Sequence, residues 1–143
     1  MYVVRGLPNV RYQVDCVVSI LNIYHLPKFE KYLLSEGLIN DRTPISCNIA
    51  HEPLPLSITS IPQEEKKKIE DYLMQEFETL PPAMKIRHRK YGWFQVINFM
   101  NNAHTYKKGG IAEYLDLALK FAREDVLENI PLMKLIYDLD HNE

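Results

Sequence analysis

The chain has 143 residues, a mass of 16.8 kDa and a formal net charge of −2, with 46% hydrophobic and 25% charged residues. These values are typical of one globular core, and they exclude a disordered chain or two large domains. The slightly acidic balance gives no overall attraction to nucleic acid or anionic membranes, and no apolar run reaches the roughly 18 residues of a spanning helix. Since the N-terminus also lacks the layout of a signal peptide, we expect a single cytoplasmic domain over residues 1–143 that is not bound to a membrane.

The first third of the chain has the pattern of a β-α-β unit. β-branched and aromatic residues predict strands over 10–22 and 45–49, and the residues between them predict a helix over 26–37 that ends at Gly37. A strand, a helix and a second strand within about forty residues are typical of a crossover between two parallel strands. The sequence therefore predicts a small parallel sheet.

A single crossover unit is too small to complete a parallel sheet. Such sheets are normally covered on both faces, and an exposed strand edge can pair with another chain. We therefore expect residues 10–20 to pair with a protein partner, for which self-association is the simplest form, or to be covered by C-terminal helices.

The second half of the chain is predicted to be mainly helical. The fold class is therefore α/β or α+β, with incomplete parallel βα units in a βαβ-like portion over 1–60 and a helical portion over 61–143. Residues 84–89 or 56–59 are candidates for further strands. Apolar residues at helical spacing predict helices from Pro62, from Gly92, over 111–123, and within 126–137 with a restart at Pro131.

The helix that begins near Pro62 carries two further local signals. Thr59 or Ser60 stands just upstream and can cap the first turn. Three successive lysines, 66–68, are expected to lie on a solvated face of this helix.

Cys16 and Cys47 are the only cysteines, and each lies in a predicted strand. In a cytosolic chain we expect two reduced core thiols, although neighbouring parallel strands would also allow a disulfide. The sequence contains no CxxC or CxxxCxxC spacing, so the chain cannot hold a four-cysteine cluster by itself. The five histidines have no spacing typical of a metal site, and no metal ligands are predicted.

Polar residues follow both predicted strands. Asn22 follows the first strand, and His51 and Glu52 follow the second. Ligands in β/α architectures bind at the carboxyl ends of the strands, so these three residues are the candidate ligand-facing residues. The alternative is that they only cap local backbone. No catalytic residues are predicted, because no triad order, GxSxG, P-loop or GxGxxG occurs.

Basic and aromatic residues are interleaved near the middle of the chain. Such a surface can bind phosphates and stack bases, but the same alternation is typical of a half-exposed strand. The acidic net charge argues against a dedicated nucleic-acid binder, and a protein-interaction surface is the preferred interpretation. The candidate basic-aromatic surface comprises Lys85, Arg87, Arg89, Lys90 and Trp93.

Several short motifs resemble part of the twitch-type radical S-adenosylmethionine enzymes. They are residues 14–22 with the following Leu26-Pro27 and the helix ending at 36–39, the strand-like run 52–58, the helix start at 61–66, and a weakened C-terminal signature at Arg123 and 131–132. The resemblance covers most of the chain. It implies the second half of a partial (β/α) barrel, with the tail that lies over the active site.

The chain departs from this family where the cofactors bind. The family's activity needs a CxxxCxxC loop and a Gly-rich stretch for the S-adenosylmethionine amino group, and both would lie upstream of Met1. The resemblance therefore implies a truncated barrel that is inactive alone and holds no cofactor. S-adenosylmethionine and an iron–sulfur cluster would enter only if another polypeptide completed the chain. The alternative is a protein-interaction or structural module of a larger assembly.

Overall fold

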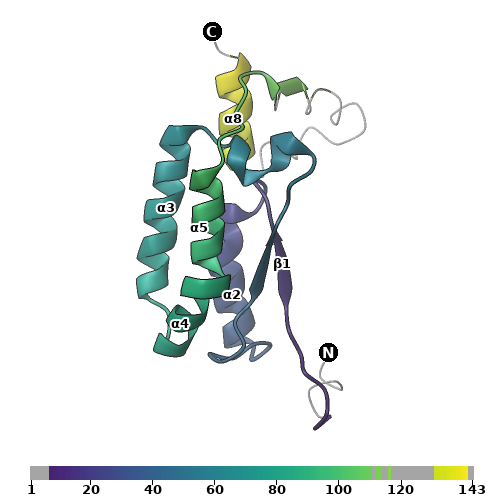
Figure 1. Ribbon diagram of the computed structural model, residues 1–143, viewed down its shortest axis with the longest axis vertical. Coiled ribbons are helices and arrows are strands. Elements are labelled where there is room, and N and C mark those ends of the chain that lie inside the picture. The colour runs from purple at the N-terminus through teal and green to yellow at the C-terminus, as the bar shows by residue number, and fades with distance from the viewer. Residues whose placement is uncertain (1–6, 111, 114–115, 117–130, 142–143) are drawn as a thin grey trace.

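The computed structural model describes residues 7–110, 112–113, 116 and 131–141, and its first elements form the predicted crossover (Figure 1). The two strands are parallel neighbours, with Cys16 opposite Cys47. The strands are shorter than the predicted ranges, and the crossover helix ends before Gly37, which has a φ of 64°. The unit comprises β1 (Asp15–Val18), the turn η1 (Ile23–His25), α2 (Leu26–Ser35) and β2 (Ser46–Ile49).

Most of the described chain after β2 is helical, which confirms the mixed and mainly helical fold class. Most of the helix predicted over 111–123 lies outside the described residues, as does Arg123. The helix predicted to restart at Pro131 does begin there. The elements are the turns η2 (Leu54–Leu56) and η3 (Ile58–Ser60), and the helices α3 (Gln63–Glu78), α4 (Pro82–Tyr91), α5 (Trp93–Asn102) and α8 (Pro131–His141).

Helices cover one face of the two-stranded sheet. In Figure 1, α2, α3 and α5 lie on one side of the strands, and β1 is the strand farther from these helices. Val18 and Cys47 are buried, whereas Asp15, Val17 and Asn48 are exposed. This alternation follows from the two-residue period of a strand, so one face of the sheet packs and the other meets solvent.

The core is built by apolar side chains at helical spacing. In α3, Ile69, Leu73 and Phe77 are fully or almost fully buried at intervals of four residues. Residues at these intervals share one helix face. Burying each such side chain contributes about 1.5–3 kcal/mol to the free energy of folding, so this apolar stripe is the main interaction that holds α3 on the core. In α5, the buried side chains Trp93, Val96, Ile97 and Met100 form the corresponding stripe.

The additional strands predicted over 84–89 and 56–59 are wrong. Residues 84–89 lie within α4, and 56–59 lie in the turns η2 and η3. Pro82 occupies the first turn of α4, where a proline favours helix, and Met84 and His88 are buried four residues apart. The helical period therefore decides which of these residues face the core.

The solvated face predicted for the three lysines of α3 is wrong for Lys66. Its side chain is 1% exposed, and Nζ donates a hydrogen bond to the carbonyl of Ala103 at 3.0 Å. Burial lowers the pKa of Lys66. Lys67 and Lys68 do face solvent, where they pair with acidic residues of the same helix. Three consecutive residues point about 100° apart around a helix, so one of them turns inward.

The predicted cap of α3 is also wrong. The Ser60 hydroxyl donates to the carbonyl of Leu54 at 2.6 Å, and the Thr59 hydroxyl lies 2.6 Å from that of Thr105. Neither side chain makes a capping hydrogen bond to α3. Both are buried, so their hydroxyls bond to the chain segments that enclose them.

Candidate functional site

Asn22 closes the turn that follows β1. Its Oδ1 accepts a hydrogen bond from the backbone nitrogen of Ser19 at 2.9 Å, and its Nδ2 donates to the carbonyl of Val17 at 2.7 Å. The side-chain amide is therefore engaged with local backbone. This arrangement agrees with the structural interpretation of Asn22, in which the residue caps the end of a strand.

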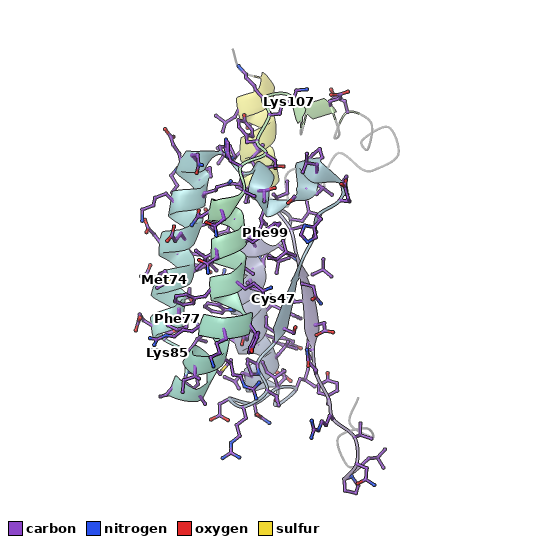
Figure 2. The ribbon with its side chains drawn as sticks, in the orientation of Figure 1. Cys47, Met74, Phe77, Lys85, Phe99 and Lys107 are labelled. Atoms are coloured by element: carbon purple, nitrogen blue, oxygen red, sulfur yellow. The ribbon has the colours of Figure 1, made fainter. Side chains whose placement is uncertain are left out.

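His51 and Glu52 follow β2 at the same end of the sheet, and both are exposed. The His51 ring meets the ring of Phe99 edge-on, with centroids 5.0 Å apart, and Figure 2 labels Phe99 on α5. This contact holds the imidazole against a helix. The two residues thus lie at the carboxyl end of the strands, as the sequence predicts.

The basic residues of the candidate surface lie on α4. Arg87, Arg89 and Lys90 are exposed, whereas Lys85 is partly buried and forms an ion pair with Glu78 at 3.1 Å. Figure 2 shows Lys85 near Phe77, and its Nζ is 5.7 Å from the centre of that ring. The helix therefore spreads the basic side chains around its surface instead of aligning them along one face.

Trp93 does not belong to that surface, which corrects the sequence prediction. Its side chain is fully buried at the start of α5. Large aromatic residues gain most from burial, and here the indole also finds an acceptor in the core. The tryptophan belongs to a buried polar cluster with Glu30 and His88.

Glu30 is the centre of this buried cluster. One carboxylate oxygen lies 2.6 Å from His88 Nε2, and the other accepts a hydrogen bond from Trp93 Nε1 at 2.9 Å. The imidazole and indole rings are stacked, with centroids 5.1 Å apart. Glu30 and His88 are both 0% exposed, so α2, α4 and α5 meet at a carboxylate whose two oxygens are both bonded.

His88 keeps one nitrogen without a partner. Nε2 faces the carboxylate, and in the described part of the chain the buried Nδ1 has no hydrogen-bond partner. Gly92 lies against this nitrogen, because a Cβ built at residue 92 would come within 1.9 Å of it. An imidazole held by a carboxylate through one nitrogen can exchange a hydrogen bond or a proton with a ligand through the other.

His88 also forms part of the wall of a cleft of about 880 Å³. The cleft lies between the extended residues 10–13, the loop that leads into β2, and the end of α4. Its volume falls within the range of small-molecule sites. Three arginines, Arg11, Arg42 and Arg87, line it.

The two cysteines lie side by side near the same carboxylate. Cys47 is buried and Cys16 is half-buried, and both are free thiols. Burial raises the pKa of both thiols above the ordinary value of 9.0; the neighbouring Cys16 raises that of Cys47 further, and Glu30 adds to the shift of both. The thiolate is therefore disfavoured at both positions, so neither thiol is a ready nucleophile or metal ligand.

The sequence prediction missed Glu30 and His88, although a signal was present. Glu30 lies on the face of α2 that also carries Leu26 and Leu33, at spacings of four and three residues. A carboxylate within an apolar stripe predicts a buried polar contact. The partner could not be found by spacing, because His88 lies 58 residues further along the chain.

The described residues contain neither a metal-binding cluster nor a helix that could span a membrane. Within the ranges that the structure describes, no three side chains of the metal-binding types gather in one place. None of the described helices is both long and apolar enough to cross a membrane.

Comparisons of the chain with protein families, with curated proteins and with solved structures gave no match.

Proposed function

We propose that this chain is an incomplete portion of a radical S-adenosylmethionine-like protein, inactive alone and completed by another polypeptide. The single observation that carries the proposal is the one-sided β1–α2–β2 unit. Helices pack against the face that holds Val18 and Cys47, while Asp15 and Asn48 are exposed on the other. In a partial (β/α) barrel the helices form the outer layer and the inner face of the strands faces the ligand space.

The outward face continues beyond the paired residues of β1. Arg11, Gln13, Asp15 and Val17 are all exposed, and every second residue between them is more buried. Gln13 Nε2 donates to Asp15 Oδ1 at 2.8 Å, so this face carries an organised polar pair. A polar inner face is what an open barrel segment would offer to a ligand, and it supports the proposal.

The far edge of β1 offers a place for completion. The carbonyls of Val14 and Val18 accept hydrogen bonds from β2, at 2.9 Å each. In a parallel ladder the alternate residues, here Asp15 and Val17, direct their backbone groups to the opposite edge. No strand among the described residues pairs there, although Asn22 Nδ2 already donates to the Val17 carbonyl on this edge. A further strand from another polypeptide could extend the sheet at this edge.

The test begins with gene context and ends with reconstitution. The proposal expects a neighbouring reading frame that encodes CxxxCxxC. When the two polypeptides are produced together, they should purify as a complex that shows iron–sulfur absorbance and cleaves S-adenosylmethionine reductively. The isolated chain should do neither. A stable cluster on this chain alone, or a co-produced polypeptide that never binds it, would contradict the proposal.

The alternative function is a protein-interaction or structural module, and the same free edge of β1 favours it. The two functions predict different partners, because only the first requires a partner with the cysteine motif. A stable complex with a protein that lacks the cysteine motif and any S-adenosylmethionine chemistry would favour the module.

A further inference from the structure

We infer that the cleft beside α4 binds a small phosphorylated anion that carries two or more negative charges. The inference does not depend on the proposed function, because the cleft is built entirely from this chain. Its residues come from three separate segments: the stretch before β1, the loop before β2, and the end of α4.

The charge of the lining favours an anion. Arg11, Arg42 and Arg87 each come from a different segment. Within the described part of the chain, none of the three guanidinium groups forms an ion pair. The lining, which consists wholly of described residues, includes no carboxylate, although Asp41 lies between two lining residues. Guanidinium groups with no acidic partner are the usual receptors for phosphate oxygens.

The buried imidazole supplies an independent reason. His88 is fully buried, lines the cleft, and keeps Nδ1 without a partner in the described structure. A buried polar atom without a hydrogen bond is costly, and a ligand oxygen would remove the cost once the residues that enclose Nδ1 move aside to admit it. Glu30 lies 2.6 Å from the other nitrogen, so this carboxylate would balance the charge if a bound anion brought a second proton onto the ring and Nδ1 donated to it.

The number of positive groups selects a polyvalent ligand. A single carboxylate has two oxygens and one charge, and one arginine satisfies it in bidentate fashion. Three arginines that line one cleft match a diphosphate better, because it has more oxygens and more negative charge. The volume of about 880 Å³ leaves room for the rest of a phosphorylated small molecule.

The test measures binding of inorganic pyrophosphate to the full chain at about 0.15 M salt, where non-specific attraction is screened. Trp93 is the only tryptophan, and its ring is stacked on that of His88, so its fluorescence reports on the wall of the cleft. We expect a saturable change, with pyrophosphate binding more tightly than inorganic phosphate. Absence of saturable binding to the folded chain would overturn the inference.

Variants locate the site. Arg42→Gln and Arg87→Gln should each weaken pyrophosphate binding at least about tenfold, since each removes a charged hydrogen-bond donor. Arg89→Gln is the matched control, because Arg89 is exposed on the same helix but faces Phe77, 5.7 Å from that ring, and does not line the cleft. Its affinity should be unchanged. An equal loss in Arg89→Gln would show diffuse attraction and overturn the site.

Two further arms test the ligand class and the role of the histidine. Nitrogen resonances of His88 should shift on pyrophosphate binding, and an unchanged imidazole would remove His88 from the site. A single-stranded RNA oligonucleotide should bind no better than pyrophosphate. If the RNA binds more tightly and loses equal affinity in Arg87→Gln and Arg89→Gln, the basic surface of α4 binds nucleic acid, and the small-ligand inference fails.

Discussion

At the scale of single residues, the buried Glu30–His88 pair has the largest expected effect on stability. Removing one member of a buried, hydrogen-bonded carboxylate–imidazole pair leaves the other polar group without compensation, at a cost of about 3–5 kcal/mol. We therefore expect Glu30→Leu and His88→Leu each to lower the free energy of unfolding by that amount, measured by urea denaturation. Glu78→Leu, which removes the exposed ion pair with Lys85, should cost less than about 1 kcal/mol.

The double variant Glu30→Leu/His88→Leu tests whether the two residues act as a pair. It removes both polar partners, so it should cost much less than the sum of the single changes. A remaining loss of about 1–3 kcal/mol is expected, because Trp93 Nε1 then has no acceptor. Additive losses would show that the two side chains do not interact.

Gly92 is a second residue whose substitution has a defined consequence. A Cβ at this position would lie 1.9 Å from His88 Nδ1, so Gly92→Ala must displace the imidazole from Glu30. We expect the free energy of unfolding to fall by about 3–5 kcal/mol, because the overpacked site separates the imidazole from Glu30 as removal of either partner would. The control is Gly110→Ala, where the nearest atom is 4.0 Å from the added Cβ, and it should change stability by less than about 0.5 kcal/mol.

At the scale of elements, the pairing of β1 with β2 places two thiols next to each other. Cys16 and Cys47 occupy one register position, and burial raises the pKa of both. In the unfolded chain a thiol ionises near 9.0, whereas the folded chain keeps Cys47 protonated. The folded state therefore binds more protons above pH 9.0, and its stability falls as the pH rises from there towards the folded pKa.

This linkage predicts a measurable pH dependence. Between about pH 7 and about pH 10, Cys47 should account for a loss of about 1.4 kcal/mol in the free energy of unfolding. Cys47→Val removes the ionisable group. Over the same pH range, the free energy of unfolding of the variant should therefore fall by about 1.4 kcal/mol less than that of the unchanged chain. Urea denaturation under reducing conditions at both pH values measures the difference. If the free energies of unfolding of the two proteins changed equally with pH, the burial of the Cys47 thiol would be contradicted.

At the scale of the whole molecule, the free edge of β1 predicts association. α8 lies at the opposite end of the molecule from the chain segment before β1 (Figure 1). Its described side chains Leu132 and Ile136 are buried in the core. Among the described residues, this C-terminal helix leaves the outer edge of β1 uncovered, and we propose that another chain pairs with that edge. Sedimentation at micromolar concentration should give a species heavier than 16.8 kDa.

Two substitutions of one residue test whether the edge mediates this association. Val17 is 59% exposed, and its backbone N–H faces away from β2, so Val17→Pro should keep the fold but prevent edge pairing. Val17→Thr keeps the N–H and the branched shape, and should associate like the unchanged chain. A monomeric unchanged chain, or association that survives Val17→Pro, would remove the case for pairing at this edge.

Local features of the sequence determined much of the fold. The β-branched segments, the proline and glycine at the ends of α2, and the apolar spacing of α3 and α5 all act within a few residues. The parallel arrangement of β1 and β2 followed from the length of the crossover alone. The spacing of apolar residues predicts helices and strands because the repeat of each element is set by the geometry of its own backbone.

Only the tertiary structure decided which polar side chains are buried and which of them meet. By residue type alone, surface or interface positions are expected for Glu30, Lys66 and Trp93. All three are nevertheless buried in the core. The burial of Glu30 depends on His88 and Trp93, 58 and 63 residues away, which supply its hydrogen bonds. The cleft likewise needs arginines from three segments. Such sites depend on contacts between distant segments, and one-dimensional spacing does not encode them, because the energy of a buried charge is set by its neighbours in space.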